Sequence, residues 1–236
     1  MKINHHPIER TCPEVEVFES ILSLDHKTIL ELGCGDATLT RLIATAGEAR
    51  QLTATEVDTV QHEKNLLIED LSNVKFVFAG GQNIPLSNGS VDTVFMFKSL
   101  HHVPVEAMGQ TFEEIHRVLK PGGIAYISEP IFAGDLNEIY RIFHDEEKVR
   151  YLAFEAIRKV VSSQKFSLKE QLFFNTPRMY ESYEQFYDQV AGISYNDFQL
   201  SDSLLEKIEW KFKQMVTKNG GEFITPIRVD LLQKPA

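Results

Sequence analysis

The chain has 236 residues, of which 43% are hydrophobic and 25% are charged, and its formal net charge is −10. An acidic chain of this kind argues against a broad electrostatic hold on nucleic acid or on an anionic membrane. No apolar run approaches the ~20 residues of a membrane span, and the first residues lack the apolar core of a secretory signal. The two cysteines, Cys12 and Cys34, form neither a disulfide framework nor a metal-ligand spacing, so we expect a reduced, cytoplasmic protein.

Apolar runs alternate with amphipathic runs along the first 130 residues. Helical spacing predicts helices over 13–24, 37–47, 59–71 and 104–119. Buried runs predict strands over 28–32, 51–56, 74–79, 91–98 and 123–129. Strands that alternate with helices indicate parallel crossovers, and the sequence therefore predicts an α/β fold with a doubly wound sheet.

The pattern changes after residue 130. Helices are predicted over 135–163, 182–191 and 201–219, and strands over 166–176 and 222–234. Pro226 suggests a bulge or an edge position in the last strand. We expect one domain over 1–236 with a seven-stranded, mostly parallel sheet and helical insertions after the fifth and sixth strands. An N-terminal helical flap over 1–27 and a helical lid or substrate-side insertion within 131–221 complete the expected organisation.

The stretch ILELGCGDATLT at 29–40 joins the first strand to its helix. Gly33 and Gly35 lack a Cβ, so the turn can be tight and a ligand can approach the backbone. A dinucleotide would require G-x-G-x-x-G, but Thr38 stands at the third position. Glu31, at the strand end, suits the positive ammonium and sulfonium groups of S-adenosylmethionine better than a pyrophosphate. A plain tight turn beside a surface acid is the alternative for this stretch alone.

A second acid, Glu56, closes the second strand about 20 residues beyond the glycines. A carboxylate at this position can accept both hydroxyls of a ribose, in a dinucleotide or in S-adenosylmethionine. Asp58 is the competing acid, and its position predicts an N-cap of the following helix instead. We therefore expect Glu56 to bind the ribose.

Four blocks in order carry a resemblance to a known family: ILELGCGDATLT, ATEVD, NIPLSNGSVDTVFMFKSLHHV and EIHRVLKPGGIAYISEP. Together they resemble the class I S-adenosylmethionine-dependent methyltransferases. They are most similar to the small-molecule type that includes the ubiquinone and menaquinone biosynthesis methyltransferases. The resemblance covers about residues 28–130 and the terminal strand. It implies a Rossmann-like methyltransferase fold and transfer of a methyl group from S-adenosylmethionine to a small-molecule acceptor.

The resemblance also implies where the cofactor would lie. Glu31 and the backbone of Gly33, Cys34 and Gly35 would border the methionine moiety, and Glu56 would bind the ribose. Val57 would flank the adenine, whose edge would face Gly81, Gln82 and Asn83. Lys98, beside Ser99, would face the sulfonium.

Three positions depart from the family pattern. Ala37 replaces the third glycine, a small change that we expect to be tolerated. Gly80 replaces the usual acid at the adenine edge, so the hydrogen bond to the adenine amino group would come from Gln82 or Asn83, or be missing. Lys98 places a cation beside a sulfonium, which is unfavourable unless its side chain points away or pairs with an acid such as Glu129 or Asp92.

Transfer of a methyl group from a sulfonium mainly requires alignment, and a base is needed only for an acceptor that stays protonated. His101 and His102, after the fourth strand, and Glu129, at the end of the fifth, are the candidate catalytic residues. His102 matches the family pattern better than His101; its alternative role is a hydrogen bond that holds the loop. The alternative role of Glu129 is a structural partner for Lys98. His144, in HDEE, predicts a solvated helix face because consecutive residues diverge around a helix, and no metal site is expected.

The sequence is also compatible with two other functions. A non-catalytic or altered-cofactor protein on the same fold is the rival from another class, motivated by Gly80 and Lys98. A nicotinamide-dependent oxidoreductase is less favoured because of Thr38 and the LKPGG block. Aromatic residues of 140–154 and 173–187 either line an apolar acceptor pocket or, as we expect for most, form a core under the inserted helices. The acceptor, the methylated atom and the choice between monomer and homodimer stay undetermined.

Overall fold

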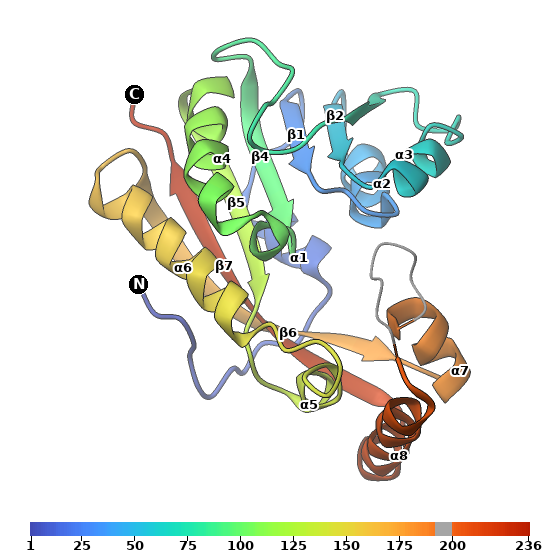
Figure 1. Ribbon diagram of the computed structural model, residues 1–236. Helices are drawn as coiled ribbons and strands as arrows, with labels where there is room; N and C mark the ends of the chain where they lie inside the picture. The colour runs from blue at the N-terminus through green and yellow to red at the C-terminus, as the bar shows by residue number, and fades with distance from the viewer. Residues whose placement is uncertain (192–199) are drawn as a thin grey trace.

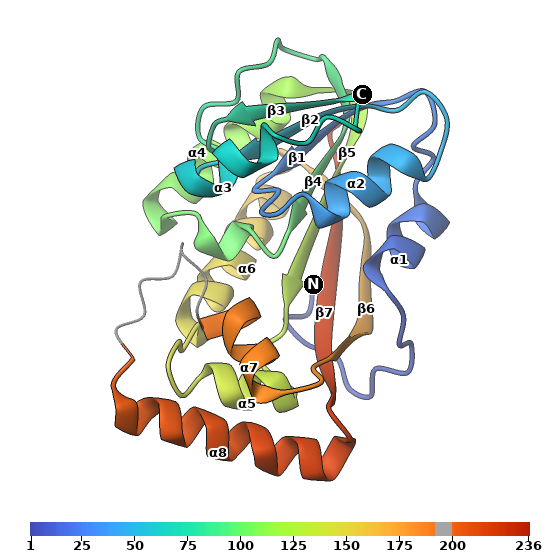
Figure 2. The same ribbon diagram turned by 90° about the vertical axis from the view of Figure 1, so that its right-hand side faces the viewer.

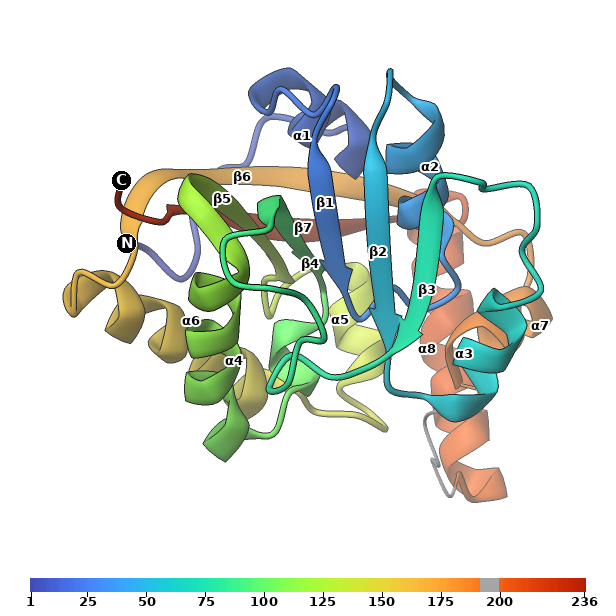
Figure 3. The same ribbon diagram turned by 90° about the horizontal axis from the view of Figure 1, so that it is seen from above.

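The computed structural model describes residues 1–191 and 200–236. Its centre is a seven-stranded sheet with the order β3-β2-β1-β4-β5-β7-β6 (Figures 1 and 3). The strands are β1 (Thr28–Leu32), β2 (Gln51–Glu56), β3 (Val74–Phe78), β4 (Val91–Phe97), β5 (Leu119–Pro130), β6 (Ser167–Met179) and β7 (Glu222–Gln233). Strands β1 to β5 pair in parallel, whereas β7 is antiparallel to both β5 and β6. The prediction of an α/β, mostly parallel, seven-stranded sheet is confirmed.

Helices cover both faces of this sheet. They are α1 (Glu14–Ile21), α2 (Thr38–Thr45), α3 (Thr59–Asn65), α4 (Val105–Val118), α5 (Asp135–Tyr140), α6 (Glu147–Ser162), α7 (Tyr183–Phe186) and α8 (Asp202–Asn219), with short turns η1 (Leu100–His102) and η2 (Tyr187–Ala191). Figure 2 shows α4 and α6 on one side of the sheet and α1 and α2 on the other. Two hydrophobic cores correspond to these faces: Phe112 and Ile157 belong to one, and Phe18 and Ile43 to the other. The sheet is therefore doubly wound, as predicted.

The strand order reverses beside β1, because β2 lies on one side of it and β4 on the other. In a doubly wound sheet, ligands bind outside the carboxyl ends of the strands at such a point. The connections that follow β1, β2, β3 and β4 therefore define the region in which to look for a site.

The helix predicted over 135–163 is wrong as a single element. It is divided into α5, which ends at Tyr140, and α6, which begins at Glu147. Residues 141–146 connect the two helices, and Glu146 in this connection is buried against His101. Local helical periodicity continues across this connection, whereas the contact found there joins residues 45 apart in sequence. The helix predicted over 59–71 likewise ends early, at Asn65.

A third hydrophobic core lies away from the glycine-containing turn. It joins α5, α7 and α8 to the far ends of β6 and β7, and its largest members are aromatic: Tyr180, Phe186, Phe212 and Phe223. Figure 1 shows these helices gathered around the part of the β6–β7 ribbon that extends beyond β5. For Tyr180 and Phe186, which lie in the stretch 173–187, the interpretation as core is supported. Within the predicted 131–221 insertion, residues 192–199 lie outside the described residues.

The N-terminal segment packs against the body of the fold. Val17 and Phe18 of α1 are buried in the second core, and the Cys12 N–H donates to the Asn175 carbonyl of β6 at 3.0 Å. That residues 1–27 move as a flap stays a prediction. Among the described residues, the helices lack the combination of length and apolar composition that crossing a membrane requires.

Candidate active site

The turn after β1 holds two glycines with different environments. Gly33 has φ +73°, and a Cβ on it would lie 2.8 Å from Cβ of Ser99, so a side chain has no room there. Gly35 has φ +54°, but a Cβ on it would meet no heavy atom within 4 Å. Cys34 between them is buried, and its N–H donates to the Thr55 carbonyl at 2.9 Å. Gly33 is thus required by packing, whereas Gly35 leaves its backbone open to a ligand.

Ala37, which replaces the third glycine, has φ 61° and immediately precedes α2. A left-handed conformation costs a residue with a Cβ roughly 1–2 kcal/mol. The residue is buried, so its methyl group is also packed. The substitution is accommodated with some backbone strain.

Glu31 lies beneath this turn and is only 1% exposed. Its carboxylate accepts a hydrogen bond from Oγ1 of Thr40 at 2.6 Å. Burial raises the pKa of Glu31 to about 8, although the Thr40 hydrogen bond opposes the change. The protein therefore holds at neutral pH a largely protonated acid that a nearby positive charge would ionise.

Glu56 joins the turns after β1 and β2. Its Oε2 accepts a hydrogen bond from the Gly35 N–H at 2.8 Å, and its Oε1 accepts from the N–H groups of Val57 and Asp58 at 2.8 and 2.9 Å. Asp58 accepts instead from the Gln61 N–H at 2.6 Å, which confirms its predicted role as the N-cap of α3. The side chain of Val57 is exposed beside Glu56. A single carboxylate thus fixes both turns.

The segment after β3 bears on the missing acid at position 80. A Cβ on Gly80 would lie 2.6 Å from Oε1 of Gln82, so the Gln82 amide occupies the space next to this glycine. A Cβ on Gly81 would lie 2.6 Å from Cγ2 of Thr111, which places the segment tightly against α4. Gln82 and Asn83 are both exposed. Of the two predicted replacements for the acid, Gln82 is the one whose amide lies beside Gly80.

Lys98, directly after β4, pairs with an acid that the sequence did not indicate. Its Nζ lies 3.8 Å from Oε2 of Glu14, a buried residue of α1. The expected partners were wrong, because Asp92 bonds Lys120 at 2.7 Å and Glu129 faces His101. Burial raises the pKa of Glu14, and the Lys98 cation opposes that change. Helix α1 therefore supplies the counter-charge for Lys98.

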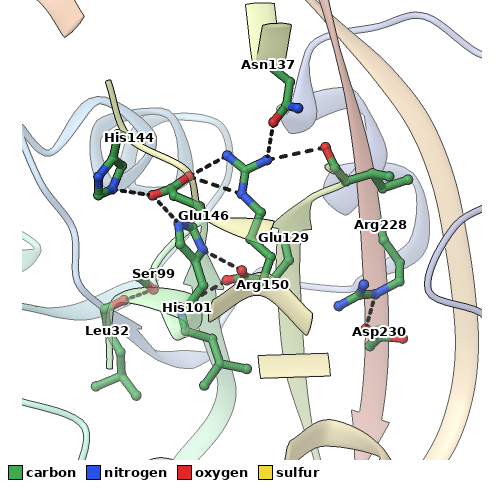
Figure 4. Close-up of polar contacts among 12 residues, drawn as sticks. Leu32, Ser99, His101, Glu129, Asn137, His144, Glu146, Arg150, Arg228 and Asp230 are labelled. Carbon is green, nitrogen blue, oxygen red and sulfur yellow. Dashed lines mark hydrogen bonds and ion pairs between the residues drawn. The ribbon is translucent and has the colours of Figure 1, made fainter. Parts of the chain in front are cut away.

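His101 and Glu129 form a buried pair (Figure 4). Nδ1 of His101 lies 2.5 Å from Oε2 of Glu129, whose Oε1 accepts the Leu100 N–H at 3.0 Å. Burial by itself would lower the pKa of His101, but the carboxylates of Glu129 and Glu146 outweigh it and raise the pKa to about 9. Burial would raise the pKa of Glu129, and the His101 cation lowers it below its usual value. The alternative role of Glu129 as the partner of Lys98 is thus replaced by a pair with His101.

Glu146 extends this pair into the connection between α5 and α6. Its Oε1 lies 3.5 Å from Nε2 of His101 and 2.9 Å from Nε2 of His144, and its Oε2 accepts from Arg150 at 2.5 Å (Figure 4). Arg150 also donates to Oδ1 of Asn137 at 3.1 Å. The solvated helix face predicted for HDEE is wrong, because the first three of these residues precede α6, which begins at Glu147, and Glu146 is buried.

His102 is exposed although the ring of His101 lies only 4.1 Å away, measured between centroids. The protein groups around the ring and the positive charge of His101 lower the pKa of His102 to about 4. Within the described part of the chain its side chain makes no hydrogen bond. The alternative role of a loop-holding hydrogen bond therefore finds no support.

Part of the sequence and the whole fold are similar to those of known proteins. Residues 29–123 match the family model described as a methyltransferase domain. The fold superimposes on that of a proposed methyltransferase from Bacillus halodurans C-125 with a TM-score of 0.65 and 15% sequence identity. The superposition covers 94% of this chain and 99% of the Bacillus chain. The chain has the Rossmann-like methyltransferase fold.

Two further proteins extend the comparison. One is phosphoethanolamine N-methyltransferase 2 of Haemonchus contortus, solved with phosphomonomethylethanolamine and S-adenosylhomocysteine. It has a TM-score of 0.56 and 14% identity over 93% of this chain and 51% of its own. In sequence, the chain is 30% identical over 138 residues to O-methyltransferase rstn1 of Aspergillus nomiae. This alignment covers 55% of this chain and 59% of the relative. The chain spans 59% or less of the length of the curated relatives that it matches here.

On this methyltransferase fold, sequence reasoning missed several residues at the site. Thr40, whose Oγ1 donates to Glu31 of β1, is one of them, because a hydroxyl in a helix is not distinctive in the sequence. Glu146 and Arg150 lie about 45 residues from His101 in sequence, and no local pattern connects them. Their spacing of four on one helical turn was the available signal, because it is typical of an ion pair.

Proposed function

We propose that the protein transfers a methyl group from S-adenosylmethionine to a small-molecule acceptor. The observation that carries this proposal is the space beside Gly35, where a Cβ would meet no heavy atom within 4 Å. The Gly35 N–H donates to the Glu56 carboxylate, and this turn lies where the strand order reverses. A side chain at position 35 would extend into the space that the cofactor needs. The matched methyltransferase domain covers this segment.

Each part of the cofactor has a group to receive it in this proposal. The methionine moiety lies along Gly33, Cys34 and Gly35, and Glu31 beneath them supplies negative charge. Of the about four acceptor sites of the Glu56 carboxylate, its three backbone hydrogen bonds use three, so one site on Oε2 remains for a ribose hydroxyl. Val57 offers an exposed apolar surface to the adenine ring.

The adenine edge faces the segment Gly81, Gln82 and Asn83. We assign the hydrogen bond to the adenine amino group to the Gln82 amide, because it lies where a side chain at position 80 would begin. Lys98 follows β4, and its pairing with Glu14 reduces the repulsion that a free ammonium would exert on a sulfonium. Neither departure from the family pattern therefore prevents the cofactor from binding.

The bound sulfonium supplies an electrophilic methyl group, and the chain has to align the acceptor with it. His102, exposed after β4, is the residue that we expect to contact the acceptor and to take its proton where the acceptor is protonated. His101 is buried between two carboxylates, so we assign to His101 and Glu129 the positioning of His102 rather than contact with the acceptor.

The finer assignments are also proposals. Similarity to the ubiquinone and menaquinone biosynthesis enzymes, a cytoplasmic location, a small-molecule rather than nucleic-acid acceptor, and a monomer or homodimer all rest on the sequence. The net charge of −10 supports the choice against nucleic acid.

The test is a calorimetric titration of the purified protein with S-adenosylmethionine, S-adenosylhomocysteine and NADH. We expect both sulfur compounds to bind and NADH not to bind. Release of S-adenosylhomocysteine in the presence of a panel of small acceptors then measures turnover. Binding of NADH alone would identify an oxidoreductase. Binding of none of the three would leave a non-catalytic relative on the same fold.

A further inference from the structure

The geometry points to a second binding site, for a divalent transition-metal cation, formed by His101, His102 and Glu146. One ligand atom from each of the three residues lies within 4.8 Å of the other two. Two of these residues belong to η1 after β4, and the third belongs to the connection before α6. We propose that the cation binds where these two segments meet.

The ligand chemistry suits such a cation. Two imidazole nitrogens and one carboxylate oxygen form a set that zinc, cobalt(II), manganese and iron(II) accept, with coordination positions left for a further ligand. Ligand atoms about 2.0–2.1 Å from a zinc ion are about 3.3 Å apart in tetrahedral geometry. Nε2 of His101 and Oε1 of Glu146 are 3.5 Å apart, which is close to that separation.

The surroundings of His101 orient it for this role. Its Nδ1 faces Glu129 at 2.5 Å, so Nε2 is directed to Glu146 (Figure 4). A histidine that ligates a metal through one nitrogen usually donates the other N–H to a carboxylate or carbonyl, which fixes the ring. Glu129 is 1% exposed and is itself fixed by the Leu100 N–H. It occupies the position of such an outer-shell partner.

The surroundings of Glu146 divide its two oxygens in the same way. Arg150 donates to Oε2 through Nε and Nη2 at 3.1 and 2.5 Å. Oε1 remains on the side of His101 and also contacts Nε2 of His144 at 2.9 Å. Glu146 is buried, which distinguishes it from the exposed acids that often gather without binding a metal.

The exposure of His102 decides what the site would do. With His101 and Glu146 buried and His102 exposed, the remaining coordination positions lie toward the exposed side of the cluster, where His102 is. This inference rests on the proposed methyl transfer in one respect: the cation would bind an acceptor that carries an oxygen ligand, such as a hydroxyl or carboxylate group. His102 would then reach the acceptor through the cation rather than directly. The competing role is a structural ion-pair network that binds no metal.

The test is a titration of chelator-treated, tag-free protein with cobalt(II), followed by the visible absorption of the bound ion. The exposed His5 and His6 are replaced by Ala in every variant, so that they cannot bind cobalt. We expect one cobalt per chain, and at least tenfold weaker binding in His102→Asn, whose exposed side chain is not needed for folding. Glu129→Gln should weaken binding 10- to 100-fold, as outer-shell changes do. Asp145→Asn removes an exposed neighbouring charge and should leave binding unchanged.

Two results would overturn the site: no cobalt binding by the parent protein, or equal binding by the parent and His102→Asn. Titration of the same samples with S-adenosylmethionine separates this inference from the proposed function. Cofactor binding without cobalt binding would remove only the metal site. Cobalt binding without cofactor binding would remove only the proposed methyl transfer.

Discussion

The cofactor half of the molecule, residues 28–130, and the insertion, residues 131–221, reach their polar sites by different routes. In the cofactor half, Glu31 bonds Thr40, nine residues away, and Glu56 bonds the next two residues and Gly35, 21 residues away. In the insertion, Glu146 meets His101, which is 45 residues away in another segment. The contacts of Glu31 and Glu56 thus span shorter stretches of chain than that of Glu146, and we expect the two regions to respond differently to substitution.

The largest expected effect lies in the insertion. Glu146→Ala leaves the buried His101 and the partly buried Arg150 without their shared carboxylate, and breaking a buried pair in this way costs about 3–5 kcal/mol of unfolding free energy. Chemical denaturation measures the loss. Glu147→Ala, which removes the next, exposed acid, is the matched control and should change stability by less than about 0.5 kcal/mol. Equal effects of the two variants would contradict a buried network.

A smaller effect is expected in the cofactor half, and on binding. Glu56→Ala removes a charged acceptor and should weaken S-adenosylmethionine binding by about 1.5–3 kcal/mol, measured by calorimetry. Asp58→Ala removes the N-cap of α3 and should lower stability by ~1 kcal/mol while affinity is retained. Unchanged affinity in Glu56→Ala would refute the ribose assignment.

The pH dependence tests the buried acid of the cofactor half. The pKa of Glu31 is about 8 in the folded protein and near the ordinary glutamate value of 4.5 in the unfolded chain. Between these values the unfolded chain releases a proton that the folded protein keeps, so stability contributed by Glu31 falls as pH rises through this window. From pH 6 to 7.5, wild type should lose about 2 kcal/mol relative to Glu31→Gln.

Thermal unfolding of both proteins across this range gives the difference directly. Taking the difference cancels the other titrating groups, including His101, which both proteins retain. A difference that stays constant with pH would show that Glu31 is ionised in the folded protein.

The smallest effect is expected at the third position of the glycine turn. Ala37→Gly relieves a left-handed conformation worth about 1–2 kcal/mol, but it removes a buried methyl group worth about 0.8 kcal/mol. The extra freedom of glycine in the unfolded chain opposes the gain as well. Denaturation should show a change below about 1 kcal/mol, and a large loss would mean that the methyl group packs more tightly than its surroundings indicate.

The same contrast explains how far the sequence predicts the structure. The strands from β1 to β4 lie within one residue of their predicted bounds, because each is a short apolar run between turn residues. The division between α5 and α6 was not predictable, because the residues around Glu146 continue a helical pattern and its buried partner His101 is 45 residues away. Lys98 was recognised as needing an acid, but Glu14 became that acid only when α1 packed beneath the sheet.

Strand β7 has a consequence for how the molecule opens. It pairs with β5 along one edge and with β6 along the other. Its side chains enter all three hydrophobic cores: Phe223 enters the core under α8, Val229 the core under α1, and Leu232 the core under α4 and α6. Unfolding of any of the three cores would remove packing contacts of β7. The amide hydrogens of β7 should therefore exchange with solvent only when the whole chain unfolds. Strand β7 is thus the one that makes the three cores a single cooperative unit.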